Sequence, residues 1–298
     1  RGTPSRMWLD WVFAVPFGME VQLPAETRAL YYDRITAALA TEAFRPRALF
    51  DRYNIEVIAT TESPIDSLEH HAVIKAENAR AGGWQGRVIT AYRPDPVVDP
   101  EFEGFRDNLR TLSELTGEDA LSYAGYLAAH RNRRAFFAQM GATSTDHGHP
   151  TAATADLSAR EAEALFARVT ANGPVSRADA ELFRAHMLTV MAGMSLEDGL
   201  VMQIHPGAHR NHNPWLFDRY GRDKGADIPT QTGFVEQLRP LLGRYGNEAG
   251  LTIILFTLDE TAYARELAPL AGHYPSLKLG PGWGFPDRPE GGRRCRPP

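Results

Sequence analysis

The sequence predicts an α/β protein and, within that class, a TIM-type (β/α)8 barrel. Short apolar, β-branched segments recur along the 298 residues with helical patterns between them. This is the order of parallel strands joined by helical crossovers. The segments are continuously apolar, as expected of strands covered on both faces. Each ends in polar or unusual residues, and in a parallel barrel the carboxyl ends of the strands meet at one mouth, where the chemistry lies.

Six segments are expected to form strands. Five are strongly apolar, and the sixth, which ends in the sequence TSTDHGHP, is less so. In chain order they cover residues 55–61, 87–94, 137–150, 200–207, 251–260 and 277–285. A doubly wound sheet would require a glycine-rich phosphate loop after an early strand, and neither GxGxxG nor GxxxxGKS/T occurs in the sequence. The barrel is therefore favoured over the doubly wound sheet.

Helical patterns occupy the gaps between these segments. Residues 158–161, SARE, form a capping box, and the apolar residues after it continue at helical spacing to Val169. A second helix is expected to begin at Ser176. Its buried face is expected to hold Leu182, Phe183, Met187, Val190 and Met191. Because no repeat or linker divides the chain, we expect one domain over 1–298, with helical insertions at about 1–53 and 155–198.

Composition excludes several classes of partner. The formal net charge is −5, and no basic run occurs before the last few residues, so neither nucleic acid nor a membrane surface is expected to bind. No stretch approaches the roughly 18 apolar residues of a membrane-spanning helix. The single cysteine excludes an internal disulfide framework and indicates a reducing compartment, with the cytoplasm as the expected location. We therefore expect a small-molecule substrate, and a homo-oligomer stays open.

Arg93 is the first candidate functional residue. It follows an apolar strand and precedes Pro94-Asp95, so it lies where the strand gives way to a rigid turn. A guanidinium in this place is suited to bidentate binding of a carboxylate. The alternative is a structural ion pair with Asp95 or another neighbour.

The segment TSTDHGHP (143–150) supplies a second group of candidates. It brings one carboxylate, Asp146, close to two imidazoles, His147 and His149. Two imidazoles two positions apart on a strand project to the same side, which suits paired metal ligation. The alternatives are that Asp146 caps the next helix and that His149 lies at the surface.

Two later segments complete the candidates. In HPGAHRNHN, the apolar run before His205 favours burial at a strand end, where an imidazole needs a polar partner, and Arg210 follows in the same loop. In GPGWGF, Trp283 is either an apolar wall for a sugar or a plug of the barrel. No nucleophile signature such as GxSxG occurs, so acid–base chemistry remains, with or without a metal.

Taken in order, these motifs resemble those of uronate isomerase, also called glucuronate isomerase, of the amidohydrolase superfamily. The opening RGTPSRMWLDWVF also resembles that family, and the likeness runs from Arg1 to about Gly291. The motifs that carry it are FRPRALFDRYNIEVIATTESPID, RVITAYRPD, TSTDHGH, MQIHPGAHRNHN and LGPGWGFPDRPEG. No single motif is specific, but the ordered set is.

The resemblance implies a distorted (β/α)8 barrel of the metal-dependent hydrolase type. It implies an isomerase that interconverts D-glucuronate with D-fructuronate, and D-galacturonate with D-tagaturonate, so that the partner is a small hexuronate. The expected catalytic residues are Asp146, His205 and Arg210, and the expected substrate-binding residues are Arg93, Trp283 and His147. Arg93 and Arg210 would hold substrate oxygens, while Asp146 and His205 would orient hydroxyls or relay protons.

Two parts of the family pattern do not occur in this sequence. The family's metal-binding His-x-His lies on its first strand, upstream of the segment that Arg1 begins, and its last strand carries Asp-Asp-Thr-Arg after the Trp motif. We therefore expect a fragment, an incomplete barrel that lacks its first and last strands. We expect no metal or other cofactor in this chain, and a divalent metal such as zinc in full-length members.

Two other functions stay open at this point. The first is a zinc-dependent hydrolase of the amidohydrolase type on the same barrel, with Asp146, His147, His149 and His205 as the zinc ligands. The second is an inactive truncated product that acts as a binding or assembly module.

Overall fold

A six-stranded parallel sheet forms the centre of the computed structural model, which describes residues 4–20, 23, 25–225, 227–282 and 293. Its strands are β1 (Val57–Glu62), β2 (Arg87–Tyr92), β3 (Ser144–His147), β4 (Val201–Ile204), β7 (Ile253–Leu255) and β8 (Leu277–Leu279). The strands lie in the order of the chain, β1-β2-β3-β4-β7-β8, and every pair is parallel. A doubly wound sheet reverses its strand order at a switch point, and this sheet does not.

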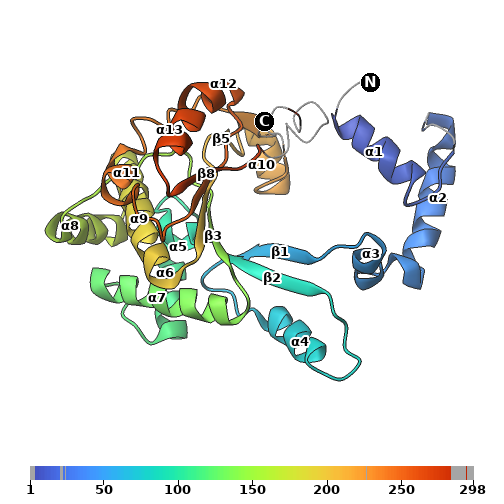
Figure 1. The fold of residues 1–298 in the computed structure, drawn as a ribbon, viewed down its shortest axis with the longest axis horizontal. Helices are drawn as coiled ribbons and strands as arrows, with labels where there is room; N and C mark the ends of the chain where they lie inside the picture. The colour runs from blue at the N-terminus through green and yellow to red at the C-terminus, as the bar shows by residue number, and fades with distance from the viewer. Residues whose placement is uncertain (1–3, 21–22, 24, 226, 283–292, 294–298) are drawn as a thin grey trace.

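Helices fill most of the connections. They are α1 (Pro4–Ala14), α2 (Arg28–Leu39), α3 (Pro46–Arg52), α4 (Glu69–Asn78), α5 (Asp95–Val98), α6 (Phe105–Thr116), α7 (Tyr123–Gln139), α8 (Ala159–Thr170), α9 (Arg177–Asp198), α10 (Pro214–Tyr220), α11 (Arg239–Tyr245), α12 (Glu260–Ala262) and α13 (Ala268–His273). A short antiparallel pair, β5 (Ala208–His209) with β6 (Ile228–Pro229), lies beside the sheet. In Figure 1, α5 to α9 lie left of the sheet, while α1 and α2 lie at the right. Within the described residues, no helix is long and apolar enough to cross a membrane.

The two faces of the sheet carry different residues. Tyr92 packs edge-on against Phe137 of α7, and Met202 and Ile204 belong to the same buried cluster as residues of α9. Side chains alternate along a strand, so the residues between them face away from these helices. On that second face, Gln203 of β4 donates a hydrogen bond to Ser144 of β3, with 3.0 Å between Nε2 and Oγ. One face therefore builds the core, and the other is free to carry polar groups.

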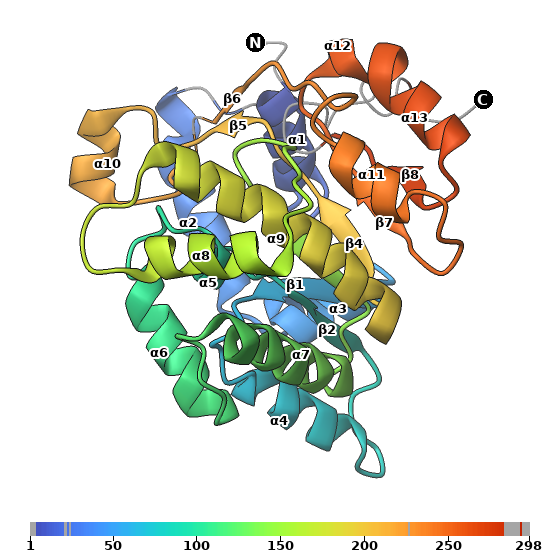
Figure 2. The same ribbon diagram turned by 90° about the vertical axis from the view of Figure 1, so that its left-hand side faces the viewer.

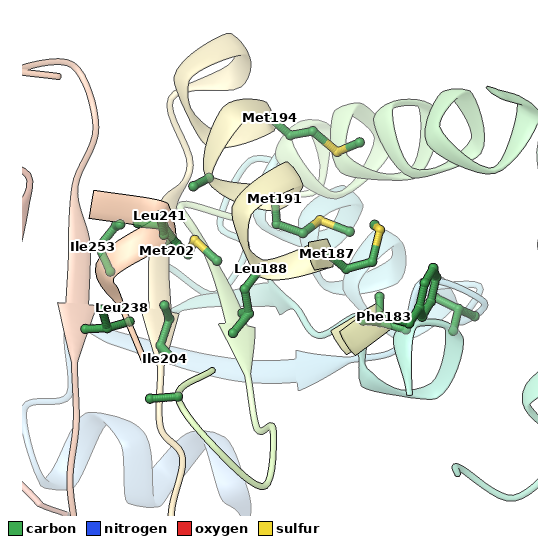
Figure 3. Close-up of a cluster of buried hydrophobic side chains, with 14 of the residues drawn as sticks. Phe183, Met187, Leu188, Met191, Met194, Met202, Ile204, Leu238, Leu241 and Ile253 are labelled. Atoms are coloured by element: carbon green, nitrogen blue, oxygen red, sulfur yellow. The ribbon is translucent and has the colours of Figure 1, made fainter. Parts of the chain in front are cut away.

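Helix α9 is the centre of the core. The helix contacts β4 and α11, and α5, α7 and α8 as well. Figure 3 shows Met187, Leu188 and Met191 of the helix and Met202 of β4 in one cluster of buried side chains. Helix α8 lies along α9, and Figure 2 shows the two side by side. The capping box expected at residues 158–161 is present, since the Ser158 side chain accepts from the Glu161 backbone and the Glu161 carboxylate accepts from the Ser158 backbone.

Most of the expected elements are confirmed, with shorter bounds. All six strand segments contain a strand of the sheet, and both helix starts, at Ser158 and Ser176, carry their side-chain caps. The α/β class with a parallel sheet is thus confirmed. The strands do not close into a barrel, because no pairing joins β1 to β8 in the described part of the chain.

Two details of the sequence prediction are wrong. The first expected strand is not buried, since Ile58, Ala59 and Thr61 of β1 are exposed. The physical reason is that β1 stands at the edge of the sheet and pairs only with β2.

The second error is Leu182, which is 38% exposed. The buried stripe of α9 runs through Phe183, Met187 and Met191, and a residue one position before that stripe lies about 100° around the helix.

We predict that Leu188→Ala destabilises the fold by about 2–5 kcal/mol, because it removes methyl groups from a fully buried position and leaves a cavity. Leu188 is 0% exposed, and Leu182 on the same helix is the matched control. Leu182→Ala is expected to change the free energy of unfolding by about 0.5 kcal/mol or less. Urea unfolding followed by circular dichroism measures both, and equal effects of the two substitutions would contradict this packing of α9.

Candidate active site

Three sequence-predicted site residues meet at the carboxyl ends of neighbouring strands. Arg93 follows β2, Asp146 lies in β3, and His205 follows β4. The Arg93 Nη1 lies 3.3 Å from one carboxylate oxygen of Asp146, and the His205 Nε2 lies 2.5 Å from the other. Each oxygen of the carboxylate thus has its own partner.

The backbone fixes the directions of these side chains. The backbone N–H of Arg93 donates to the carbonyl of Glu62 at 2.9 Å, and that of His205 donates to the carbonyl of His147 at 3.1 Å. Both bonds prolong the parallel ladders by one residue beyond the strand ends. Alternation then puts Arg93, Asp146 and His205 on the face of the sheet turned away from the helices.

Asp95 is a second partner of Arg93. The Arg93 Nε donates to the Asp95 Oδ2 at 3.0 Å. The ion pair of Arg93 with Asp95 is therefore present, and the same guanidinium also contacts Asp146. Burial lowers the pKa of Arg93, but the charges of Asp95 and Asp146 outweigh burial and raise that pKa above its ordinary value. The guanidinium is held between two carboxylates.

The Asp146 carboxylate is stabilised in its ionised form. Burial by itself raises the pKa of Asp146, but the hydrogen bond and charge of His205 and the charges of Arg93 and Arg210 outweigh burial, so the pKa falls below the ordinary 3.8. A carboxylate that stays ionised and touches an imidazole can accept a hydrogen bond from a hydroxyl or share a proton with the imidazole.

Arg210 stands near this group without touching it. It follows β5, and its side chain is one-third exposed. Its guanidinium faces Asp223 and Asp227, with nitrogen–oxygen distances of 4.0 and 3.9 Å. Its charge nevertheless reaches Asp146 and lowers the pKa of that carboxyl. The remaining predicted residue, Trp283, lies outside the described residues.

His147 does not join the group formed by Arg93, Asp146 and His205. It is adjacent to Asp146 in β3, so it faces the helices, where it is fully buried and its Nε2 lies 3.0 Å from the Thr145 hydroxyl. His149 is also buried, at 5% exposure, so a surface position for it is wrong. Burial lowers the pKa of both imidazoles. The Nε2 of His149 is 3.9 Å from the Asp95 Oδ1, which is too far for a hydrogen bond.

These residues do not fit a metal. The described residues contain no group of three or more His, Cys, Asp or Glu side chains that could hold a metal ion. Asp146 is occupied by Arg93 and His205, and His147 points to the other face of the sheet. The zinc site of the hydrolase alternative, with Asp146, His147, His149 and His205 as ligands, is therefore not assembled in the described part of the chain.

Gly148, which the sequence patterns did not single out, lies between Arg93, Asp95 and His205. A Cβ at this position would stand 2.5 Å from the Arg93 Nη2, 2.8 Å from the Asp95 Oδ2 and 3.0 Å from the His205 Cε1. Its backbone N–H also lies 3.2 Å from each oxygen of Asp95. The sequence signal for this close approach is a glycine between two histidines at the end of a strand, where a residue without a side chain leaves room for neighbouring groups.

Known proteins share this architecture. A family model described as glucuronate isomerase matches residues 1–295. The chain belongs to the glucuronate isomerase family. The family expected from the sequence motifs is thereby confirmed.

Relatives within the glucuronate isomerase family are similar over almost the whole chain. Uronate isomerase from Sphingopyxis alaskensis is 80% identical over 99% of this chain and 63% of its own length, and that from Rhizorhabdus wittichii is 69% identical over 99% and 62%. The crystal structure of glucuronate isomerase from Caulobacter crescentus superposes with a TM-score of 0.94 at 62% identity, covering 99% of this chain and 60% of that one. The crystal structure of uronate isomerase from Thermotoga maritima superposes with a TM-score of 0.88 at 26% identity, covering 97% of this chain and 62% of that one. The chain thus spans about three fifths of the length of these relatives.

We predict that Asp146→Asn lowers the free energy of unfolding by about 1–3 kcal/mol at neutral pH, because two charge-assisted hydrogen bonds lose their ionised acceptor. The folded pKa of Asp146 lies below the ordinary 3.8, so its contribution is present above pH 3.8 and is lost as the pH falls through the folded value. The difference between wild type and variant should therefore shrink below about pH 4.

Urea unfolding at a series of pH values measures this difference. The control is Asp10→Asn, which removes an exposed ion pair with Arg6 and is expected to have a much smaller effect at every pH. A difference for Asp146→Asn that stays constant between neutral and acidic pH would show that its ionisation does not stabilise the fold.

Proposed function

We propose that the complete protein is a uronate isomerase, an intramolecular oxidoreductase that interconverts D-glucuronate with D-fructuronate and D-galacturonate with D-tagaturonate. The observation that carries the proposal is the contact group of Arg93, Asp146 and His205, in a chain that belongs to the glucuronate isomerase family. A cation, a carboxylate and an imidazole within contact distance are the groups that this reaction needs.

The chemistry follows from the substrate. Aldose–ketose isomerisation moves a proton between adjacent carbons through an enediol, so it requires proton transfer and stabilisation of negative charge that develops on oxygen. A hexuronate also carries a carboxylate, for which a guanidinium is the best-matched partner. We assign the binding of substrate oxygens to Arg93 and Arg210, and the orientation of hydroxyls or relay of protons to Asp146 and His205.

We also propose that the sheet is part of a closed (β/α)8 barrel. Two observations support this finer fold. The strands follow the chain order without a reversal, and the relatives are long enough to carry further strands, since this chain spans 62% and 63% of the length of two of them. Closure of a parallel barrel would gather the carboxyl ends of all strands around one mouth.

For the compartment we propose the cytoplasm. The support is compositional, since one cysteine in 298 residues is what a reducing environment permits and a disulfide-stabilised protein does not show.

An isomerase assay tests the proposed function. We expect D-glucuronate to be converted to a ketose. A coupled enzyme that reduces this ketose with NADH makes the conversion measurable as loss of NADH absorbance. The assay should be run on the 298-residue chain and on a longer chain extended at both ends with the flanking segments of the Sphingopyxis alaskensis relative, which is 80% identical. Conversion by neither protein would refute the proposal, and conversion by the longer chain alone would assign essential groups to the added segments.

For whichever chain is active, we predict that Arg93→Lys lowers kcat/KM for D-glucuronate about 10- to 100-fold. Lysine keeps the charge but loses the forked geometry, and a hydrogen bond to a charged group contributes about 1.5–3 kcal/mol. The control is Arg168→Lys, because Arg168 also pairs with an aspartate, Asp179, but its side chain is half exposed and lies on α8, away from the strand ends. Equal kcat/KM for Arg93→Lys and Arg168→Lys would remove Arg93 from the site.

A further inference from the structure

Asp95 accepts hydrogen bonds from two groups at the site, the Arg93 side chain and the Gly148 backbone, of which the sequence indicated only the first. Its Oδ2 accepts from the Arg93 Nε at 3.0 Å, and both of its oxygens lie 3.2 Å from the backbone N–H of Gly148. Arg93 follows β2 and Gly148 follows β3, so one carboxylate ties the ends of two neighbouring strands together. Its side chain is 13% exposed, so solvent competes little for these bonds.

This tie matters because β2 and β3 are held together over a short length. The register joins them at one residue pair, Tyr92 with Thr145, whereas four residue pairs join β3 to β4. Beyond Thr145 the two strand ends carry Arg93 on one side and Asp146 and Gly148 on the other. The bonds of Asp95 therefore act together with the Arg93–Asp146 contact to set the spacing of Arg93 from β3 at the level of the site.

Gly148 supplies the other half of the constraint. A Cβ at Gly148 would meet the Arg93 Nη2 at 2.5 Å and the Asp95 Oδ2 at 2.8 Å, well inside van der Waals contact. The guanidinium and the Asp95 carboxylate thus both pass close to the backbone of Gly148. Asp95 holds the guanidinium at Nε, and the bare backbone of Gly148 gives it the room to turn Nη1 toward Asp146.

We propose that Asp95, seated on Gly148, is the positioning residue that orients Arg93 toward the carboxylate of a hexuronate substrate. Asp95 itself makes no contact with the substrate; it acts through the direction of the Arg93 guanidinium. The substrate part of this proposal rests on the proposed isomerase function, whereas the orientation of Arg93 by Asp95 does not.

Two variants test the proposal by different routes. Asp95→Asn keeps the size of the side chain but removes the charge and one acceptor for Arg93 and Gly148. Gly148→Ala keeps Asp95 and displaces the guanidinium by the added methyl group. Both are expected to raise KM for D-glucuronate about 10-fold with a smaller change in kcat, because a clamp on a non-reacting carboxylate binds ground state and transition state alike. The control, Asp179→Asn, breaks the exposed ion pair with Arg168 and should leave both constants unchanged.

A second readout does not depend on activity. The N–H proton at the Arg93 Nε, assigned by its loss in Arg93→Lys, is observed by ¹⁵N-resolved NMR. In the wild type it should exchange slowly with water, because it is bonded to a mostly buried carboxylate. Exchange should become at least about 10-fold faster in Asp95→Asn and in Gly148→Ala, and stay unchanged in Asp179→Asn. A merely structural role elsewhere would not single out this proton.

The outcomes separate the two proposals. If no chain shows isomerase activity but exchange is faster in the variants, the lack of activity refutes the proposed function, and the faster exchange still supports the positioning of Arg93 by Asp95. With activity present, unchanged KM and unchanged exchange in both variants overturn the role of Asp95. Should Asp95→Asn fail to fold, as judged by circular dichroism, the same measurements on Gly148→Ala decide: slow exchange and an unaltered KM there would also overturn it.

Discussion

The site depends on the pairing of one short strand. β3 has four residues, and it lies between β2 and β4, so it sets the distance between the residues that follow those two strands. In the parallel register, Asp146 stands opposite Gln203 and His147 opposite Ile204. A shift of one residue would turn Asp146 to the helices and His147 to the polar face. The contact of Asp146 with His205 exists only in the observed register.

Apolar packing on the helix-covered face of the sheet stabilises this register. Met202 and Ile204 of β4 lie in the same buried cluster as α9, and Tyr92 of β2 packs against α7. The apolar face of the sheet thereby fixes which residues are left for the opposite face. There, three charged or polar groups can be concentrated because each has a partner: Arg93 between Asp95 and Asp146, and His205 on the second oxygen of Asp146. An unpaired charge at the same depth would destabilise the fold.

The sequence predicted the strands and the chemistry of their ends better than it predicted which residues share a face. Arg93, Asp146 and His205 were all expected in the site because each stands where an apolar strand ends, and the structure brings them into contact. His147 was grouped with Asp146 because the two are adjacent, although neighbours in a strand point to opposite faces. Asp95 was expected only as an ion-pair partner of Arg93, and Gly148 was not expected in the site, because the contact of Asp95 with Gly148 requires two strand ends to approach closely.

By itself, the sequence determined the local features: the capped start of α8 at Ser158, the apolar stripe of α9 that contains Phe183 and Met187, and the polar ends of the strands. These follow from periodicity and from hydrogen bonds within a few residues. Only the tertiary structure decided which strand ends meet. Arg93 and Asp146 are 53 residues apart, and Asp146 and His205 are 59 apart. Their contact requires the order and register of the sheet, which arise from packing between distant segments and leave no mark in the local sequence.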